Sequence, residues 1–267
     1  MVDYSQKIRE DYRHKQKRKI MFFFFAGLIS VLIIISIFVL RGDLFHIKNY
    51  DIQGNHSIST EEIIKKTKEF LSHSNWLYRT ILPDENSIIF YIKKNDIKNK
   101  LMAQIPSIKD ANFSVDIFPP KITINVSERD KFALWCIKKE VGECFWFDSE
   151  GIVFEKGPWS EGELIRKITD EENKDVFLGK NVIEQRYLKN IQAIFEFLEK
   201  SNISRRSLFI QNSNLAEIQT SNLEKPIIYF SLKEDPNFAL SALEKIKDKL
   251  HNFEYIDFRV NNRVYYK

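Results

Sequence analysis

The sequence of 267 residues lacks the short motifs by which many enzymes are recognised. It contains no P-loop, no G-x-G-x-x-G, no G-x-S-x-G and no S-x-x-K. Its histidines show no H-x-x-x-H spacing, and its cysteines no C-x-x-C spacing, of the kind that gathers a metal ion. We therefore expect no catalytic residues, metal site, cofactor or small-molecule substrate. The five histidines are His14, His46, His56, His73 and His251.

Cysteine is also scarce, with only Cys136 and Cys144 in the chain. The seven residues between them are typical of a turn that joins two aromatic-rich strands. A disulfide between the two is possible outside the cytoplasm and would contribute about 2–3 kcal/mol by closing a short loop. Two free, half-buried thiols are the alternative.

Glycine and proline are few, at eight and seven residues, and no Gly/Ser linker, low-complexity run or fixed-period repeat interrupts the chain. This composition gives little sign of disorder. The part after residue 40 is long enough for one large or two small domains.

Charge is absent from one stretch altogether, residues 20–40. Its 21 residues, at about 1.5 Å each, span roughly the 30 Å hydrocarbon core of a bilayer. A buried core helix is rarely apolar on every face, and a cleaved signal peptide has a shorter apolar region before a small-residue cleavage site. Phe38–Arg41 offers no such site. We therefore predict one retained transmembrane helix.

The basic residues lie mostly before this span. Residues 1–19 hold seven of the 41 Lys and Arg and three of the 37 Asp and Glu, which leaves 34 of each for the rest of the chain. The net charge of +4 therefore lies in residues 1–19. It indicates that this segment is on the cytoplasmic side of a membrane, where it would be attracted to anionic headgroups, and it does not indicate nucleic-acid binding. We expect a disordered cytoplasmic tail at 1–19 and residues 41–267 outside.

The first exterior part, residues 45–129, has a β-α-α-β-β pattern. Phe45–Ile52 is typical of a strand, and Ser59-Thr60-Glu61-Glu62 is a capping-box sequence that begins a helix. We expect residues 72–94 to form a connecting segment with partial strand character. A second helix, capped by Asn95 or Asp96, should run to Pro106.

Two segments with every second residue apolar follow, 111–117 and 122–126, around Pro119-Pro120. They predict an antiparallel hairpin with one buried face.

Residues 130–267 predict a second domain, α+β with mostly antiparallel strands. The segment 155–180 is typical of a loop, and Arg263–Tyr266 could extend the last strand. The expected strands are 132–137, 143–147, 152–154, 208–210, 216–220, 226–232 and 255–260, and the expected helices are 183–200 and 237–251.

Several segments resemble the bacterial division protein family FtsQ/DivIB. That family combines a basic tail, one membrane span, a POTRA domain and a C-terminal β-domain, in the order predicted here. The segments are Phe45–Asn55, like the start of a POTRA domain; Phe118–Arg129, like P-x-x-L-x-I-x-V-x-E-R; Asp148–Phe154, like D-x-x-G-x-V-F; and Tyr255–Arg259, like the terminal I-D-L-R strand.

The chain departs from the family pattern at three places. Asp116, Ile117 and Phe118 stand where basic residues are usual, so a charge-based role for that corner is doubtful. The segment 155–180 has no matching feature, and Val260 stands where some members have an aromatic residue.

The resemblance implies a non-catalytic division scaffold in the inner membrane at the septum. Such proteins bind FtsB and FtsL, and the POTRA domain would contact other division proteins. A strand at a sheet edge can accept one more strand from a partner. On this basis Val260→Pro should abolish partner capture. The expected contact residues are Tyr255, Asp257, Arg259, Val260, Arg263, Tyr265 and Tyr266.

Other interpretations remain open. The last strand could simply be core on one side and solvated on the other. A POTRA-containing protein of transport or outer-membrane assembly would need a transmembrane β-barrel. Such a barrel is built from alternating strands of about ten residues each, and this sequence has too few of them. A membrane-anchored envelope enzyme would need a catalytic group that the sequence does not show.

Overall fold

A computed structural model describes residues 4–72, 85–116, 119–138, 142–159, 162–172, 175–201, 203, 205–211, 215–221 and 225–267. The chain divides into two compact units, which we describe separately. The first comprises Met1–Leu101 and Ala111–Val126, and the second comprises Met102–Asp110 and Ser127–Lys267.

The first unit begins with one long helix, α1 (Tyr4–Arg41). Within it, Lys15–Leu40 is long and apolar enough to cross a membrane, and none of this segment is buried in the protein. The disorder expected for residues 1–19 was wrong from Tyr4 onward, because the helix begins there. Once the apolar span has formed the helix nucleus, each added residue costs little, and Lys, Arg and Gln favour helix.

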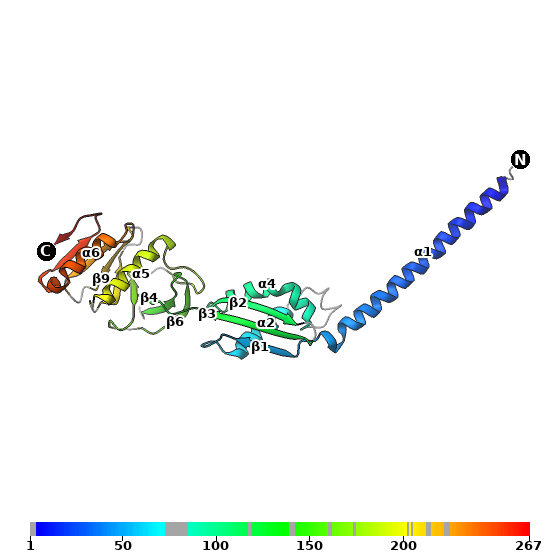
Figure 1. The fold of residues 1–267 in the computed structure, drawn as a ribbon, viewed down its shortest axis with the longest axis horizontal. Coiled ribbons are helices and arrows are strands. Elements are labelled where there is room, and N and C mark those ends of the chain that lie inside the picture. Colours follow the sequence, from blue (N-terminus) through cyan, green and yellow to red (C-terminus); the bar gives the residue numbers. More distant parts are fainter. Residues whose placement is uncertain are drawn as a thin grey trace. The chain divides into compact units, whose positions relative to one another are not determined.

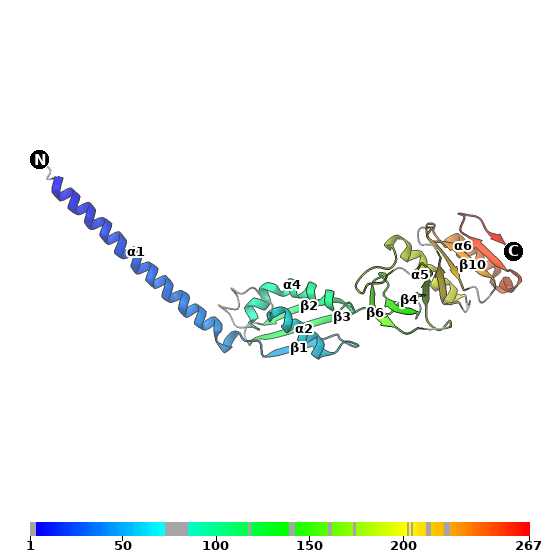
Figure 2. The ribbon, with the colours of Figure 1, turned by 180° about the vertical axis from the view of Figure 1, so that it is seen from behind.

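Among the described residues of the region after α1, the predicted β-α-α-β-β order is confirmed (Figures 1 and 2). A short 3-10 helix, η1 (Asp43–Phe45), precedes it. Ile122, Ile124 and Val126 are buried and their neighbours in sequence are not, as the alternation predicted. The elements are β1 (Asn49–Gln53), α2 (Thr60–Ser72), α4 (Ser87–Gln104), β2 (Ile108–Asp116) and β3 (Lys121–Glu128), with the strands in the order β1-β3-β2.

The capping box at the start of α2 is confirmed in its main contact, since the backbone N–H of Glu62 donates to Ser59 Oγ at 3.1 Å. Helix α4, however, begins eight residues before the expected cap at Asn95. Asn86 precedes it, and its Oδ1 accepts the N–H of Ile88 at 2.9 Å. The strand character expected up to residue 94 was therefore wrong from Ser87 onward, while the earlier part, 73–84, lies outside the described residues.

The second unit is built on a mixed sheet that is mostly antiparallel, as predicted. Among the described residues it has nine strands in the order β12-β11-β10-β9-β8-β7-β4-β5-β6. The parallel pairs are β10 with β11, β4 with β7 and β7 with β8. The strands are β4 (Ala133–Ile137), β5 (Glu143–Phe147), β6 (Val153–Gly157), β7 (Lys167–Asp170), β8 (Ser207–Ile210), β9 (Glu217–Thr220), β10 (Ile227–Ser231), β11 (Tyr255–Phe258) and β12 (Tyr265–Tyr266).

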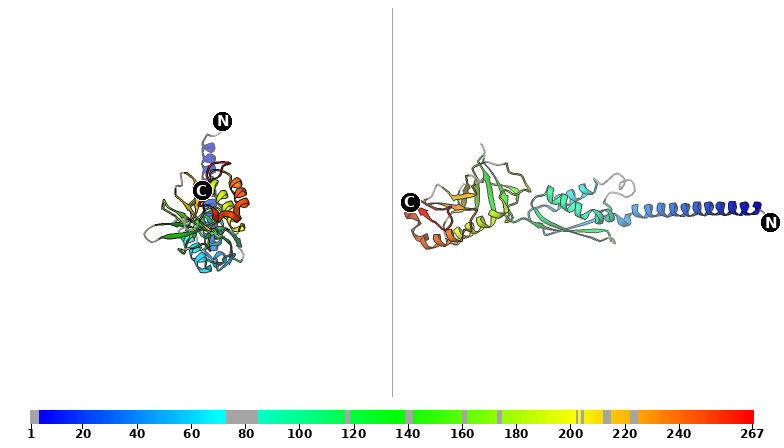
Figure 3. Two further views of the ribbon diagram at one scale, coloured as in Figure 1. Left: turned by 90° about the vertical axis from the view of Figure 1, so that its left-hand side faces the viewer. Right: turned by 90° about the horizontal axis from the view of Figure 1, so that it is seen from above.

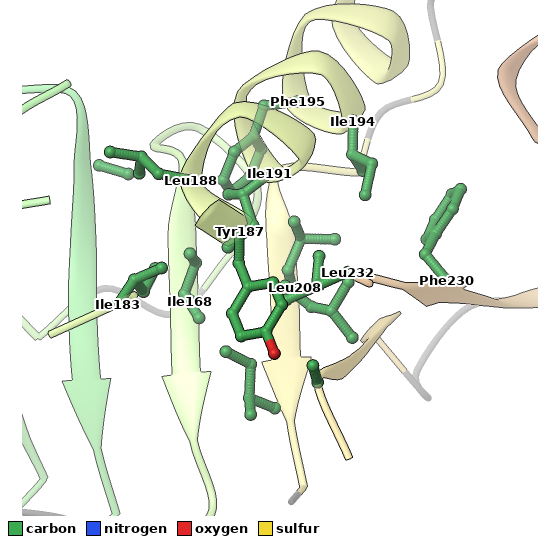
Figure 4. Packing of buried hydrophobic residues seen from close by; sticks show 14 of the residues in the cluster. Ile168, Ile183, Tyr187, Leu188, Ile191, Ile194, Phe195, Leu208, Phe230 and Leu232 are labelled. Carbon is green, nitrogen blue, oxygen red and sulfur yellow. The ribbon is translucent and has the colours of Figure 1, made fainter. Parts of the chain in front are cut away.

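Two helices, α5 (Gln185–Lys200) and α6 (Asn237–Ile246), lie against one face of this sheet (Figure 3). A 3-10 helix, η2 (Lys247–Asn252), continues α6 where a longer α-helix was expected. Figure 4 shows the main core, in which Tyr187, Ile191 and Phe195 of α5 contact strand residues such as Ile168 and Leu208. This core leaves the opposite face of the sheet for other contacts.

The segment 155–180 was wrongly expected to be a loop throughout. Strand β6 extends to Gly157, and β7 (Lys167–Asp170) lies inside the sheet between β4 and β8. A four-residue parallel strand is too short to show a period in sequence, so its burial became apparent only in three dimensions.

A disulfide and a set of hydrogen bonds around Asp148 stabilise β4 and β5 and the turn after β5. Cys136 and Cys144 face each other across β4 and β5 and form a disulfide. Arg129 donates from Nη1 to Asp148 Oδ2 at 2.5 Å and from Nε to the carbonyl of Pro106 at 3.0 Å. Asp148 Oδ1 also accepts the N–H groups of Glu150 and Ile152, so this carboxylate shapes the turn that the family pattern predicted.

Candidate partner-binding edge

The outer strand of the sheet is β12, formed by Tyr265 and Tyr266. It is antiparallel to β11, with Ile256 opposite Tyr266 and Asp257 opposite Tyr265. The expectation that Arg263–Tyr266 would extend the preceding strand was therefore wrong. Strand β11 ends at Phe258, the chain reverses, and β12 covers the edge that the sequence had assigned to β11.

A tight reversal connects the two strands. The N–H of Arg263 donates to the carbonyl of Val260 at 3.1 Å, and Asn262 has a positive φ of 55°. Asparagine tolerates this left-handed conformation better than most residues with a side chain. Val260 thus lies in the bend and not in the last strand, where the sequence had placed it.

The end of the chain is bound to the start of β11. The N–H of Lys267 donates to the carbonyl of Tyr255 at 3.3 Å, and the N–H of Glu254 donates to the carbonyl of Lys267 at 2.5 Å. Lys267 Nζ also lies 3.1 Å from Glu254 Oε2. These contacts hold the C-terminal end of β12 in register with the start of β11.

The register decides which backbone groups of β12 face outward. In an antiparallel pair, residues that exchange hydrogen bonds alternate with residues that do not. Lys267 bonds to Tyr255, so Tyr265 takes the next bonded position, and Tyr266 lies between them. The N–H and carbonyl of Tyr266 therefore point away from β11, toward the place that a further strand would take.

The same strand presents aromatic surface. The side chain of Tyr266 is 63% exposed and that of Tyr265 is 47% exposed. The ring of Phe253 meets the ring of Tyr266 edge-on, with 5.2 Å between the centroids. A partner strand could therefore pair with the outward-facing backbone of Tyr266. It would also contact the exposed parts of the Tyr265 and Tyr266 rings, the second of which is held by its contact with Phe253.

Arg259 organises the open face of the sheet next to this edge. Its guanidinium donates to both carboxylate oxygens of Asp257, at 2.6 to 3.1 Å, and to Glu217 Oε2 at 2.9 Å. It also lies 4.8 Å from the ring centroid of Tyr229. The arrangement links three neighbouring strands, since Glu217 is in β9, Tyr229 in β10 and Asp257 in β11.

The charges of this cluster affect one another. Burial acts to raise the pKa of the Asp257 carboxyl, but hydrogen bonds from Arg259 outweigh it and hold that pKa below its ordinary value. Hydrogen bonds to Asp257, and secondarily to Glu217, raise the pKa of Arg259. A hydrogen bond with Tyr265 likewise raises the pKa of Arg263. Asp257 and Arg259 are thus engaged with each other and serve to shape the face of the sheet.

The other expected residues are distributed around the edge. Tyr255 is half-buried, and its ring meets that of Tyr229 edge-on at 6.5 Å. Val260 is 46% exposed in the bend, and Arg263 is exposed just before β12. The seven residues therefore lie on two strands and their connection, and only Tyr265 and Tyr266 belong to the outer strand itself.

A depression beside the bend was missed from the sequence. It is lined by Pro236 and Phe238 at the start of α6 and by Val260 and Asn261 of the bend. Phe238 is 40% exposed although it lies in an apolar helix. The sequence does carry a signal for it, because Phe238 stands out of phase with the inward residues Ala239 and Leu243 of the helix.

In the part of the chain that the structure describes, no group of three or more His, Cys, Asp or Glu side chains is placed to hold a metal ion.

Comparison with known proteins identifies the region that follows α1. Residues 45–129 match the family model described as POTRA domain, FtsQ-type. No curated protein matches the chain. The match covers the same residues as the β-α-α-β-β region, which follows directly on a helix that can cross a membrane. Residues 45–129 of this chain are therefore a POTRA domain of the FtsQ type, in agreement with the resemblance to the FtsQ/DivIB family.

Proposed function

We propose that the chain is a bitopic scaffold protein of the bacterial division machinery, of the FtsQ/DivIB family. One observation carries the proposal: an FtsQ-type POTRA domain follows immediately after a helix long enough to span a bilayer, and the described residues contain one such helix. The FtsQ-type POTRA family is generally non-enzymatic. The protein would act by holding other proteins together at the septum.

The proposed orientation places residues 1–19 in the cytoplasm and the folded parts outside the inner membrane. Seven Lys and Arg precede the span, whereas Arg41 and Lys48 are the nearest ones after it. Positive charge is retained on the cytoplasmic side during insertion. The POTRA region and the nine-stranded sheet would then meet partners on the far side of the lipid.

The proposed docking mode is addition of a strand to β12. Main-chain hydrogen bonds to Tyr266 would supply affinity, and the exposed rings of Tyr265 and Tyr266 would supply specificity. The partner would be the exterior segment of a small bitopic division protein of the FtsB/FtsL type. Other division proteins would contact the POTRA domain.

Strand addition also gives a reason for the cluster around Arg259. A strand added at an edge binds well only if the edge is already ordered, because ordering on binding costs free energy. The contacts of Arg259 with Asp257 and Glu217 fix β11 against β9, and β12 is paired to β11. The cluster would thus pre-order the docking edge.

The proposal is tested by the location of the protein in cells and by the proteins that co-purify with it. A fluorescent fusion of the full chain should collect at mid-cell before constriction, and the detergent-solubilised protein should co-purify with small bitopic coiled-coil proteins. A variant lacking residues 264–267 should keep its membrane insertion but lose those partners. A uniform membrane signal with no such partners would contradict the proposal.

A further inference from the structure

Two large apolar side chains are exposed near the start of α4. Tyr91 is 53% exposed and Ile92 is 66% exposed. Farther along the same outward face, the exposed residues Asn95, Asp96 and Asn99 are polar. The large exposed apolar side chains of this helix are therefore confined to its first two turns, among the described residues.

That end of α4 is fixed close to the end of the membrane-spanning segment. Asn86, which precedes the helix, donates from Nδ2 to the carbonyl of Leu40 at 3.1 Å. The N–H of Ile47 donates to the carbonyl of Glu85 at 2.9 Å, and His46 forms a β-bridge with Asn86. Leu40 is the last residue of the segment that can cross a membrane.

The distances allow contact with lipid. Ile92 is six residues beyond Asn86, so the helix rises only about 9 Å between them. The headgroup layer on each side of a bilayer is roughly 5–8 Å thick, half of the difference between the full thickness of the bilayer and that of its hydrocarbon core. Because side chains in an α-helix tilt toward its N-terminus, those of Tyr91 and Ile92 reach back toward Leu40, so they can enter this layer while Leu40 remains at the edge of the hydrocarbon.

The chemistry of the same turns suits a headgroup layer. Tyrosine is enriched where membrane meets water, because its ring is apolar and its hydroxyl is polar. Lys93 and Lys94 follow directly, residues 87–95 contain no acidic residue, and Lys94 Nζ lies 4.8 Å from the ring centroid of Tyr91. Anionic headgroups attract lysines placed in this way.

We propose that the first two turns of α4 dock on the headgroup layer of the membrane that α1 spans, with Tyr91 and Ile92 inserted and Lys93 and Lys94 facing anionic phosphates. This contact requires the span and the POTRA fold but not the proposed division function. It would hold the POTRA domain at the lipid surface.

The test uses the full-length protein in nanodiscs that contain phosphatidylglycerol and phosphatidylethanolamine. The native cysteines are bridged and buried, so a single engineered thiol can be labelled. An Ile92→Cys variant carries an environment-sensitive fluorophore, and lipids with spin labels near the headgroup act as quenchers. Asn99→Cys is the matched control, because it lies seven residues later on the same exposed face.

The expected result is a shift of emission to shorter wavelength and a loss of most of the emission by quenching at position 92, with neither at position 99. Replacing Lys93 and Lys94 by Gln should reduce the quenching at 92, and so should replacing the anionic lipid by a neutral one. Equal, water-like emission at both positions would overturn the proposal. So would shielding at 92 that appears only when another protein is added.

Discussion

Asp257 of β11 lies opposite Tyr265 of β12, which makes the two-residue strand β12 the outer edge of the sheet. The neighbouring residue, Tyr266, turns its backbone N–H and carbonyl away from the protein. This alternation makes the docking proposal testable at the level of single backbone groups.

The first prediction concerns Tyr266→Pro. Proline has no N–H, but an edge strand tolerates it where that N–H faces solvent. The variant should therefore keep the second unit folded and lose partner binding in a pull-down with the exterior segment of the partner. The sequence alone had suggested Val260→Pro, which falls in the bend and would not test edge pairing.

The Tyr266→Ala variant distinguishes the contribution of the Tyr266 ring to binding from that of its backbone N–H. It removes the contact with Phe253 and much of the exposed aromatic surface but keeps the N–H. We expect Tyr266→Ala to weaken binding and Tyr266→Pro to weaken it much more. Equal losses for the two variants would argue that only the ring matters.

The second prediction concerns the pair formed by Arg129 and Asp148. The two side chains are only 10% and 3% exposed, and Arg129→Met would leave the carboxylate buried without its cation. Removing one partner of a buried pair costs about 3–5 kcal/mol. Urea denaturation should show this loss in the free energy of unfolding.

A neighbouring ion pair serves as the control. Lys109 Nζ lies 2.9 Å from Glu150 Oε1, but both side chains are more than 40% exposed. Lys109→Met should change stability little, because solvent screens this pair. A loss for Arg129→Met no greater than that for Lys109→Met would contradict the structural role assigned to Arg129.

The third prediction concerns the disulfide. Replacing Cys136 and Cys144 together by Ala should lower the free energy of unfolding of the second unit by about 2–3 kcal/mol, the chain-entropy value for so short a loop. A reductant should lower the stability of the wild-type protein in denaturant and leave the double variant unchanged. If the reductant lowers the stability of both proteins equally, the loss does not come from the Cys136–Cys144 disulfide.

The fourth prediction is a pH dependence. Arg166 donates to both carboxylate oxygens of Glu199, at 2.9 and 2.6 Å. These hydrogen bonds lower the pKa of Glu199, although burial acts in the opposite direction. A carboxyl whose pKa is lowered by folding stabilises the protein above its unfolded pKa, about 4.3 for Glu, and loses that contribution as the pH falls through its folded pKa.

Wild type should accordingly exceed Glu199→Gln in stability at neutral pH, and the difference should shrink as the pH falls below about 4.3. Denaturation curves of both proteins across that range measure it. A difference that stays constant with pH would show that the carboxylate charge contributes nothing.

Much of the fold was predictable because local patterns agree with the final packing. Ser59 and Glu62 gave the start of α2, and the alternation of Ile122 to Val126 gave β3. The start of α4 was missed because a run of isoleucines is also typical of a strand. The sequence around Asn86 has no clear hydrophobic period, so it did not show that Asn86 caps a helix.

The candidate site was predictable only in outline. The sequence placed its seven candidate contact residues near the end of the sheet, since the motif ending in Arg259 marks strand β11. It could not show that the chain reverses at Asn262, because a two-residue strand has no period and its pairing depends on contacts between Lys267 and Glu254. Edge identity is a property of the sheet and not of one segment.

The most direct test of the docking proposal is amide hydrogen exchange at Tyr266, measured residue by residue with and without the partner. Its N–H should exchange quickly in the free protein and slowly in the complex, whereas the N–H of Tyr265, which already faces β11, should change little. A complex that forms while Tyr266 exchanges as fast as before would contradict strand addition at this edge.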